Sequence, residues 1–170
     1  CSHPTFHFLL GAFGLGAWCT TSMMVLILAS NRVAELSNKA WLFEGFRTRV
    51  YLTIAVVYGT AVGLFTPPPM LNSQFQSYFF NPFISSTDDF VFVNCFHTFN
   101  NVAVVFLSTA MYAYFCVILF MKQGSMDREN GRQGMMSSYL VFLQVFLVMF
   151  FNVVSSSIYV YMNFFYTPLW

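Results

Sequence analysis

Residues 6–30 read FHFLLGAFGLGAWCTTSMMVLILAS, an apolar run that contains no Asp, Glu, Lys, Arg or Pro. A helix needs about 20 apolar residues to cross a bilayer, so this run predicts a transmembrane helix over about residues 5–30. Similar runs predict spans at about 50–66, 101–121 and 137–162, of which the first is the shortest and is borderline. Because backbone groups in lipid need hydrogen bonds within their own element, we expect uninterrupted helices. The predicted fold class is therefore all-α, a polytopic transmembrane helix bundle.

The composition excludes the soluble classes of protein. The chain has 170 residues, of which 58% are hydrophobic and 8% charged, against about 25% charged residues in a typical soluble domain. A soluble globule of this length could not bury so much apolar surface, and a disordered chain needs low hydrophobicity and high charge. The net charge of +1 and the lack of a basic stripe argue against nucleic-acid binding. The class that these exclusions leave is a membrane protein, in contact with lipid.

The placement of positive charge predicts the orientation of the helices. All seven Lys and Arg residues lie in the connections at 31–49 and 122–136, and the positive-inside rule assigns such loops to the cytoplasm. Residue 1, the loop at 67–99 and residue 170 are then extracellular, in a multi-pass protein of the plasma membrane. Four spans with both ends outside suit an internal part of a larger bundle, so we expect the chain to be a fragment.

Short motifs along the whole chain carry a family resemblance. They stand, in order, at residues 1–6 (CSHPTF), 26–32 (LILASNR), 66–73 (TPPPMLNS), 81–84 (NPFI), 97–101 (HTFNN) and 158–162 (IYVYM), followed by Phe164, Phe165, Thr167, Pro168 and Trp170. In this order and spacing they resemble the nematode serpentine receptors of class T, seven-helix G-protein-coupled receptors assigned to chemosensation. The resemblance implies a partial seven-transmembrane receptor domain over residues 1–170, with the four spans as helices three to six. It also implies an external small-molecule or odorant ligand and a heterotrimeric G protein as partners.

The resemblance gives the inner loops a role. Asn31, Arg32 and Val33 stand where rhodopsin-like receptors carry an acidic residue, an arginine and an aromatic residue, so the ion pair within that triplet is unavailable. Arg32 either contacts the G protein, with donors suited to helix C-terminal carbonyls, or only anchors the helix end at the interface. The residues expected to face the G protein are Asn31, Arg32, Val33, Arg47, Arg49, Lys122, Arg128 and Arg132.

Two cysteines, Cys1 and Cys95, lie on the predicted outer side, where a disulfide can persist. The resemblance implies a bridge between them, because many rhodopsin-like receptors tie the top of helix three to the second outer loop. The stretch from Cys1 to Arg32 is longer than is usual in that superfamily. Two alternatives therefore stay open: Cys1 lies above the helix, or the bridge is absent.

The outer loop at 67–99 is rich in aromatic residues, and three successive prolines stiffen its start. One interpretation is a lid that packs over the helix ends and lines an apolar ligand site. The other is a segment along the bilayer interface, where aromatic rings are enriched. Either arrangement keeps these rings out of bulk water.

Polar residues inside the last predicted span indicate helix contacts. They are spaced i, i+3, i+4 and i+7 from Asn152 and so share one helix face. Such groups turn away from lipid and hydrogen-bond between helices, so they either line a ligand pocket or only hold helices together. The candidate residues of a ligand pocket or of the bundle interior are Phe8, Ala12, His97, Asn101, Asn152, Ser155, Ser156 and Tyr159.

Small residues in two of the spans permit close helix packing. Gly59 and Gly63 form a GxxxG pattern, and Ala12 with Gly16 is a second pair at the same spacing. Both patterns let helix backbones approach each other, but they are common in membrane helices and carry little functional specificity.

Signals of catalysis and of metal binding are absent from the sequence. The three histidines lack a carboxylate or a second cysteine at ligand spacing, so we expect no metal and no cofactor. No hydrolase, zincin or P-loop motif occurs, and the spans hold no Asp, Glu, Lys or Arg, which argues against an enzyme. Two alternatives to a receptor stay open: a four-span structural or adhesion protein, and a fragment of a transporter.

Overall fold

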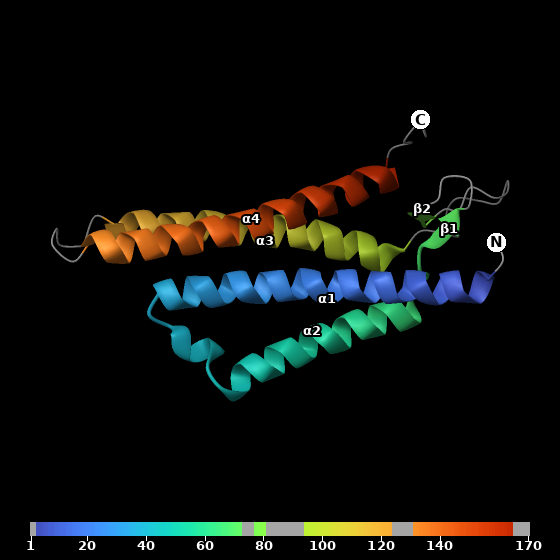
Figure 1. Ribbon diagram of the computed structural model, residues 1–170, viewed down its shortest axis with the longest axis horizontal. Coiled ribbons are helices and arrows are strands. Elements are labelled where there is room, and N and C mark those ends of the chain that lie inside the picture. The colour runs from blue at the N-terminus through green and yellow to red at the C-terminus, as the bar shows by residue number, and fades with distance from the viewer. Residues whose placement is uncertain (1–2, 73–76, 81–93, 124–130, 165–170) are drawn as a thin grey trace.

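Four long helices form the molecule, as the all-α prediction requires. The computed structural model describes residues 3–72, 77–80, 94–123 and 131–164. The helices are α1 (Pro4–Leu36), α2 (Phe46–Phe65), α3 (Cys95–Gln123) and α4 (Gly131–Phe164), with a short 3-10 helix, η1 (Ala40–Phe43), between the first two. Figure 1 shows the four helices lying lengthwise beside one another. Each predicted span falls on one of them, apart from Thr66, the last residue of the second span, which follows α2.

Helix α1 is the centre of the bundle, since it contacts α2, α3 and α4, while α3 and α4 also pack together. In Figure 1, α1 lies between α2 on one side and the α3–α4 pair on the other. The connection from α1 to α2 and the facing ends of α3 and α4 lie at one end of the bundle, which we call the inner end. The start of α1, the end of α2 and the start of α3 lie at the opposite, outer end.

The helices extend beyond several of the predicted spans. Helix α1 continues to Leu36, so Asn31, Arg32 and Val33 are helical and do not lie in a loop at 31–49. Apolar runs stop at the first charge, whereas backbone hydrogen bonding continues through charged residues that reach the interface. Just after the helix, Asn38 has a φ of 58°; its amide donates to the Glu35 carbonyl at 3.2 Å, and the Lys39 amide donates to the Ala34 carbonyl at 2.8 Å. These bonds form a Schellman motif, which satisfies the last carbonyls.

The other boundaries shift for similar reasons. Helix α2 begins at Phe46, so Arg47 and Arg49 are helical. Helix α3 begins at Cys95, because the Asn94 side chain accepts a hydrogen bond from the His97 amide at 2.9 Å and caps the helix. The predicted outer loop at 67–99 therefore ends earlier than the sequence indicated.

A short hairpin, which the sequence did not predict, follows α2. Strands β1 (Met70–Asn72) and β2 (Ser77–Phe79) pair antiparallel, with Met70 opposite Phe79 and Leu71 opposite Tyr78. The strand β1 also contacts α1. The three prolines before it cannot continue a helix, which explains why α2 ends at Phe65.

Glycines bring α1 and α2 into backbone contact. A Cβ on Gly16 would lie 2.9 Å from the Gly59 carbonyl oxygen, and a Cβ on Gly63 would lie 2.8 Å from the Ala12 carbonyl oxygen. These gaps are too small for a methyl group, so the GxxxG pattern and its partner pair form one seam. Next to this seam, Leu15, Cys19 and Val62 make a small apolar core.

Three helices are long and apolar enough to cross a membrane: Pro4–Leu36, Phe46–Phe65 and Cys95–Ile118. In α4 the apolar stretch within the residues searched, Phe146–Tyr161, is shorter. Large apolar side chains cover the outside of the bundle; Phe13, for example, is 74% exposed. Such a surface suits lipid, which the protein therefore contacts along its helices.

Candidate functional site

The inner end carries an ion pair centred on Arg32. The Arg32 guanidinium donates to a Glu35 carboxylate oxygen at 2.8 Å, and the Asn31 amide donates to the other oxygen at 2.9 Å. Asn31 replaces the acid that the rhodopsin-like triplet would place before the arginine, and Glu35, one turn later, supplies a carboxylate instead. The i, i+3 spacing of Arg32 and Glu35 is visible in the sequence, but this acid follows the triplet and does not lie within it, so the pair was not predicted.

A second arginine at this end is fixed by a tryptophan of η1. Arg47 lies over the Trp41 ring, 4.6 Å from its centroid, and donates to the Trp41 carbonyl at 2.8 Å. Arg47 and Arg49 are both exposed, and Val33 is half-buried. Lys122 and Arg132 lie on the adjacent inner ends of α3 and α4, whereas Arg128 lies outside the described residues.

The outer half of the bundle holds a buried hydrogen-bonded cluster. Asn101 is 0% exposed and accepts a hydrogen bond from the indole N–H of Trp18 at 2.8 Å, which joins α3 to α1. Its amide nitrogen lies 3.2 Å from Nε2 of His97, one turn earlier on α3. His97 is 3% exposed. Two polar side chains of α3 are thus buried inside the bundle, and one of them is hydrogen-bonded to α1.

Aromatic rings surround this cluster. The Tyr159 ring, from α4, lies 5.6 Å from Trp18 and 5.3 Å from His97, nearly perpendicular to the latter. The Phe80 ring, which follows the hairpin, lies 4.7 Å from His97. Tyr159 remains 41% exposed, so the cluster is enclosed by α1 and α3 and accessible beside α4. We call Trp18, His97, Asn101, Tyr159 and Phe80 the outer cluster.

The surrounding contacts fix the start of α3 against α2. The Asn94 side-chain amide donates to the Thr66 hydroxyl and to the Pro67 carbonyl, both at 2.8 Å. The Tyr58 hydroxyl donates to the Asn100 side chain at 3.1 Å. These bonds hold α3 in the rotation that turns His97 and Asn101 towards α1.

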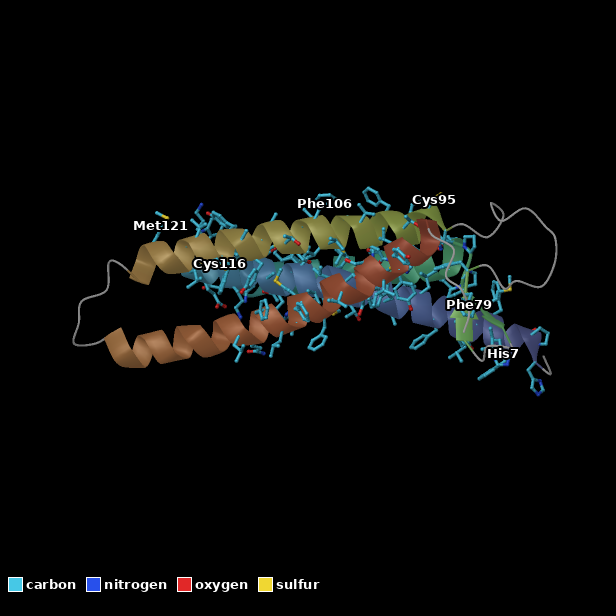
Figure 2. The ribbon with its side chains drawn as sticks, turned by 90° about the horizontal axis from the view of Figure 1, so that it is seen from above. His7, Phe79, Cys95, Phe106, Cys116 and Met121 are labelled. Atoms are coloured by element: carbon cyan, nitrogen blue, oxygen red, sulfur yellow. The ribbon has the colours of Figure 1, made fainter. Side chains whose placement is uncertain are left out.

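The hairpin packs on the outer end of α1. The Tyr78 hydroxyl lies 3.3 Å from Nδ1 of His7, and a Cβ on Gly11 would collide with the Pro69 carbonyl oxygen. Figure 2 shows His7 and Phe79 together at this end, with Cys95 at the start of α3. Within the described part of the loop, these contacts favour the lid over a segment spread along the interface.

The predicted pocket residues separate into three groups. His97, Asn101 and Tyr159 meet in the outer cluster. Asn152 and Ser156 are buried further along α4, and Ser155 is half-buried. Phe8 is 49% exposed on the surface of α1, and the Ala12 backbone borders Gly63 of α2, so neither joins the cluster.

Sequence reasoning missed Trp18, and it expected Phe80 only as one of the many aromatic residues of the outer loop. An indole N–H inside an apolar span needs an acceptor, which is the signal that could have identified Trp18.

The predicted disulfide remains a prediction. Cys95 is an exposed cysteine at the start of α3 that forms no disulfide with another described residue, while Cys1 lies outside the described residues. Within those residues, no three His, Cys, Asp or Glu side chains gather as metal ligands would.

Comparison with protein families gives one match over the whole chain. The model described as serpentine type 7TM GPCR chemoreceptor Srt matches residues 1–170. The chain belongs to the Srt family. Its resemblance to the class T serpentine receptors is thereby confirmed, and the Srt chain is a multi-pass membrane protein of a chemoreceptor family. Comparisons with curated proteins and with solved structures gave no match.

Proposed function

We propose that the Srt receptor binds a small external molecule at the outer cluster and signals to a heterotrimeric G protein at its inner end. The outer cluster carries this proposal, because it joins α1 to α3 through a hydrogen bond and joins both helices to α4 through ring contacts of Tyr159. A ligand that alters the contacts of Trp18, Asn101 or Tyr159 changes how α1, α3 and α4 pack together. Binding then favours one arrangement of the helices over another, which is a population shift.

The ligand of this site is uncharged. Helices α1 and α3 contain no Asp, Glu, Lys or Arg near the outer cluster; in α1 the first such residue is Arg32, at the inner end. A charged ligand would lose its hydration without gaining a counter-charge, at a large cost. The polar atoms of His97 and Asn101, set among aromatic rings, suit a small molecule with one hydrogen-bonding group.

The inner end suits the G protein. Arg32, Arg47 and Arg49 lie there on α1 and α2, and Lys122 and Arg132 on α3 and α4. By the positive-inside rule this end is cytoplasmic, and the hairpin is then extracellular at the plasma membrane. A basic surface beside helix ends complements the C-terminal carbonyls of an incoming helix.

Replacing Phe80 with alanine tests the outer site. We expect the concentration of ligand needed for half-maximal response to rise about fivefold, because one aromatic contact over His97 is lost. The measurement is G-protein activation by a panel of small alcohols, ketones and aldehydes. It uses cells expressing the receptor with any helices that its gene adds to this chain.

Phe99→Ala is the matched control for Phe80→Ala. Phe99 is an exposed ring on α3 (71%), so its loss should leave the response unchanged. Equal effects of the two substitutions, or silence of the well-expressed receptor towards neutral and charged molecules alike, would contradict the proposed site.

Replacing Glu35 with glutamine tests the inner site. The change releases Arg32 from its carboxylate partner, so we expect ligand-independent G-protein activation to rise. The pair is exposed, so the free energy of unfolding should change by less than about 0.5 kcal/mol. Glu44→Gln removes an equal charge at the same end and should leave basal activity unchanged. Basal activity of Glu35→Gln equal to that of Glu44→Gln would count against a restraint on Arg32.

A further inference from the structure

Four buried oxygen atoms in the middle of the bundle have no hydrogen-bond partner among the described residues. They are Oγ of Ser22, Ser108 and Ser156, and Oδ1 of Asn152. The three serines are 0% exposed and Asn152 is 8% exposed. Buried polar groups in proteins are hydrogen-bonded as a rule, so these atoms point to a bound molecule.

The four atoms lie between two layers of contacts that join the same helices. The outer layer consists of Trp18, Asn101 and Tyr159, which contact one another through one hydrogen bond and one ring pair. The inner layer consists of Val25 and Met149, which share a buried apolar cluster. Each layer brings α1 and α4 together, so the level between the layers is also interior.

Each of the three helices contributes to this intermediate level. In α1, Ser22 lies between the two layers; in α3, Ser108 lies between the outer layer and Met111, which packs on the inner layer. In α4, Asn152 and Ser156 lie between the layers. At about 1.5 Å of rise per residue, these four positions span only about 6 Å along the bundle.

Other hydroxyl groups in the same helices behave differently. Ser30 donates to the Leu26 carbonyl at 2.8 Å, and Thr109 donates to the Val105 carbonyl at 2.7 Å. Such bonds to the carbonyl four residues earlier are the ordinary way to satisfy a hydroxyl in a helix. Ser22, Ser108 and Ser156 do not make them. Their hydroxyls therefore remain available to a molecule between the helices.

The chemistry of the four groups defines the molecule they bind. Serine hydroxyls both donate and accept, whereas the Asn152 oxygen only accepts. The nearest formal charge on α1 is Arg32, well towards the inner end, so an ionic group would be buried without a counter-charge. A hydroxyl group, which is uncharged and can donate as well as accept, matches this set.

We propose that Ser22, Ser108, Asn152 and Ser156 form a buried binding site for a hydroxyl group. The hydroxyl group has two possible sources: an ordered water molecule, or an alcohol that enters past the outer cluster. The alcohol source rests on the proposed chemoreceptor function, whereas the water source does not. Both sources place hydrogen bonds between α1, α3 and α4 at a level where the described side chains form none between these helices.

X-ray radiolytic labelling of the receptor in lipid nanodiscs tests the site, because bound water yields hydroxyl radicals that oxidise adjacent side chains. Met149 is 4% exposed and lies one turn from Asn152, so we expect its oxidation despite its burial. Ser22→Ala with Ser156→Ala should lower that oxidation roughly fivefold, since bound water loses hydrogen bonds. Each single variant is measured as well, in case the double variant does not fold. Ser30→Ala is the matched control and should leave Met149 unchanged.

Two additives distinguish the sources. If benzyl alcohol lowers the oxidation of Met149 and toluene does not, the occupant is an alcohol. If neither additive changes the oxidation of Met149, the occupant is water. The site is overturned if Met149 is not oxidised in the wild-type receptor. It is also overturned if Met149 is oxidised as strongly in the Ser22 and Ser156 variants as in Ser30→Ala. Failure of the receptor to activate a G protein would contradict the proposed function, but it would not change the expected labelling of Met149.

Discussion

Replacing Gly59 with alanine is expected to destabilise the receptor by about 3 kcal/mol, the upper part of the usual range for overpacking. A Cβ on Gly59 would collide with the Thr20 hydroxyl and lie 2.5 Å from the Gly16 carbonyl oxygen. The hydroxyl can rotate, but the carbonyl belongs to the backbone of α1 and cannot. The two helices must therefore separate, which opens the seam and loosens the Leu15, Cys19 and Val62 core beside it.

The measurement is SDS-induced unfolding of the purified receptor in bicelles, together with the amount of receptor at the cell surface. Gly14→Ala is the matched control, because a Cβ on Gly14 meets nothing within 4 Å. We expect that control to be neutral or slightly stabilising, since alanine is a better helix former than glycine. Equal stability of the two variants would show that α1 and α2 do not pack through Gly59.

Replacing Asn101 with leucine is expected to cost about 2 kcal/mol of stability, because the Trp18 indole N–H is left without its acceptor inside the bundle. His97 also loses the amide that lies 3.2 Å from its Nε2. Leucine repeats the branched heavy-atom skeleton of asparagine without its polar atoms, but it is larger, so the lost hydrogen bonds must be separated from the change in packing. For any alcohol, ketone or aldehyde that activates the receptor, we expect about a tenfold loss of apparent affinity.

A double-mutant cycle separates this hydrogen bond from packing. Trp18→Phe removes the indole N–H, so Asn101→Leu in that background should cost clearly less than in the wild type. The same unfolding measurement gives all four free energies. Additive effects of the two substitutions would contradict a bond between Trp18 and Asn101. Asn101→Leu with an unchanged response to ligand would remove the outer cluster from the proposed site.

The sequence predicted the number of helices and the end at which positive charge collects. Both depend on long-range averages of polarity, which tolerate errors at single residues. Helix ends were less predictable, because the backbone of α1 continues through Arg32 to Leu36. The hairpin was missed because strands of three residues are too short to show an alternating pattern.

The candidate site was predictable only in part. His97, Asn101, Asn152 and Ser156 were candidates for a ligand pocket or for the bundle interior, and all four are buried, whereas Tyr159, from the same set, is 41% exposed. The partner of each residue was not predictable, since it depends on the rotation and tilt of neighbouring helices. Trp18 shows this most clearly, because its bond to Asn101 joins residues far apart in the chain.

The glycine seam also bears on the order of assembly in the cell. Helices α1 and α2 are consecutive in the chain, and their contact needs no residue beyond Phe65. The pair can therefore dock in the membrane while the ribosome is still translating α3 and α4. The later helices then meet a surface that already exists, on which the Trp18 indole is in place before Asn101 arrives. A substitution in the seam would therefore impair the docking of α1 and α2 during biogenesis, before a ligand site has formed.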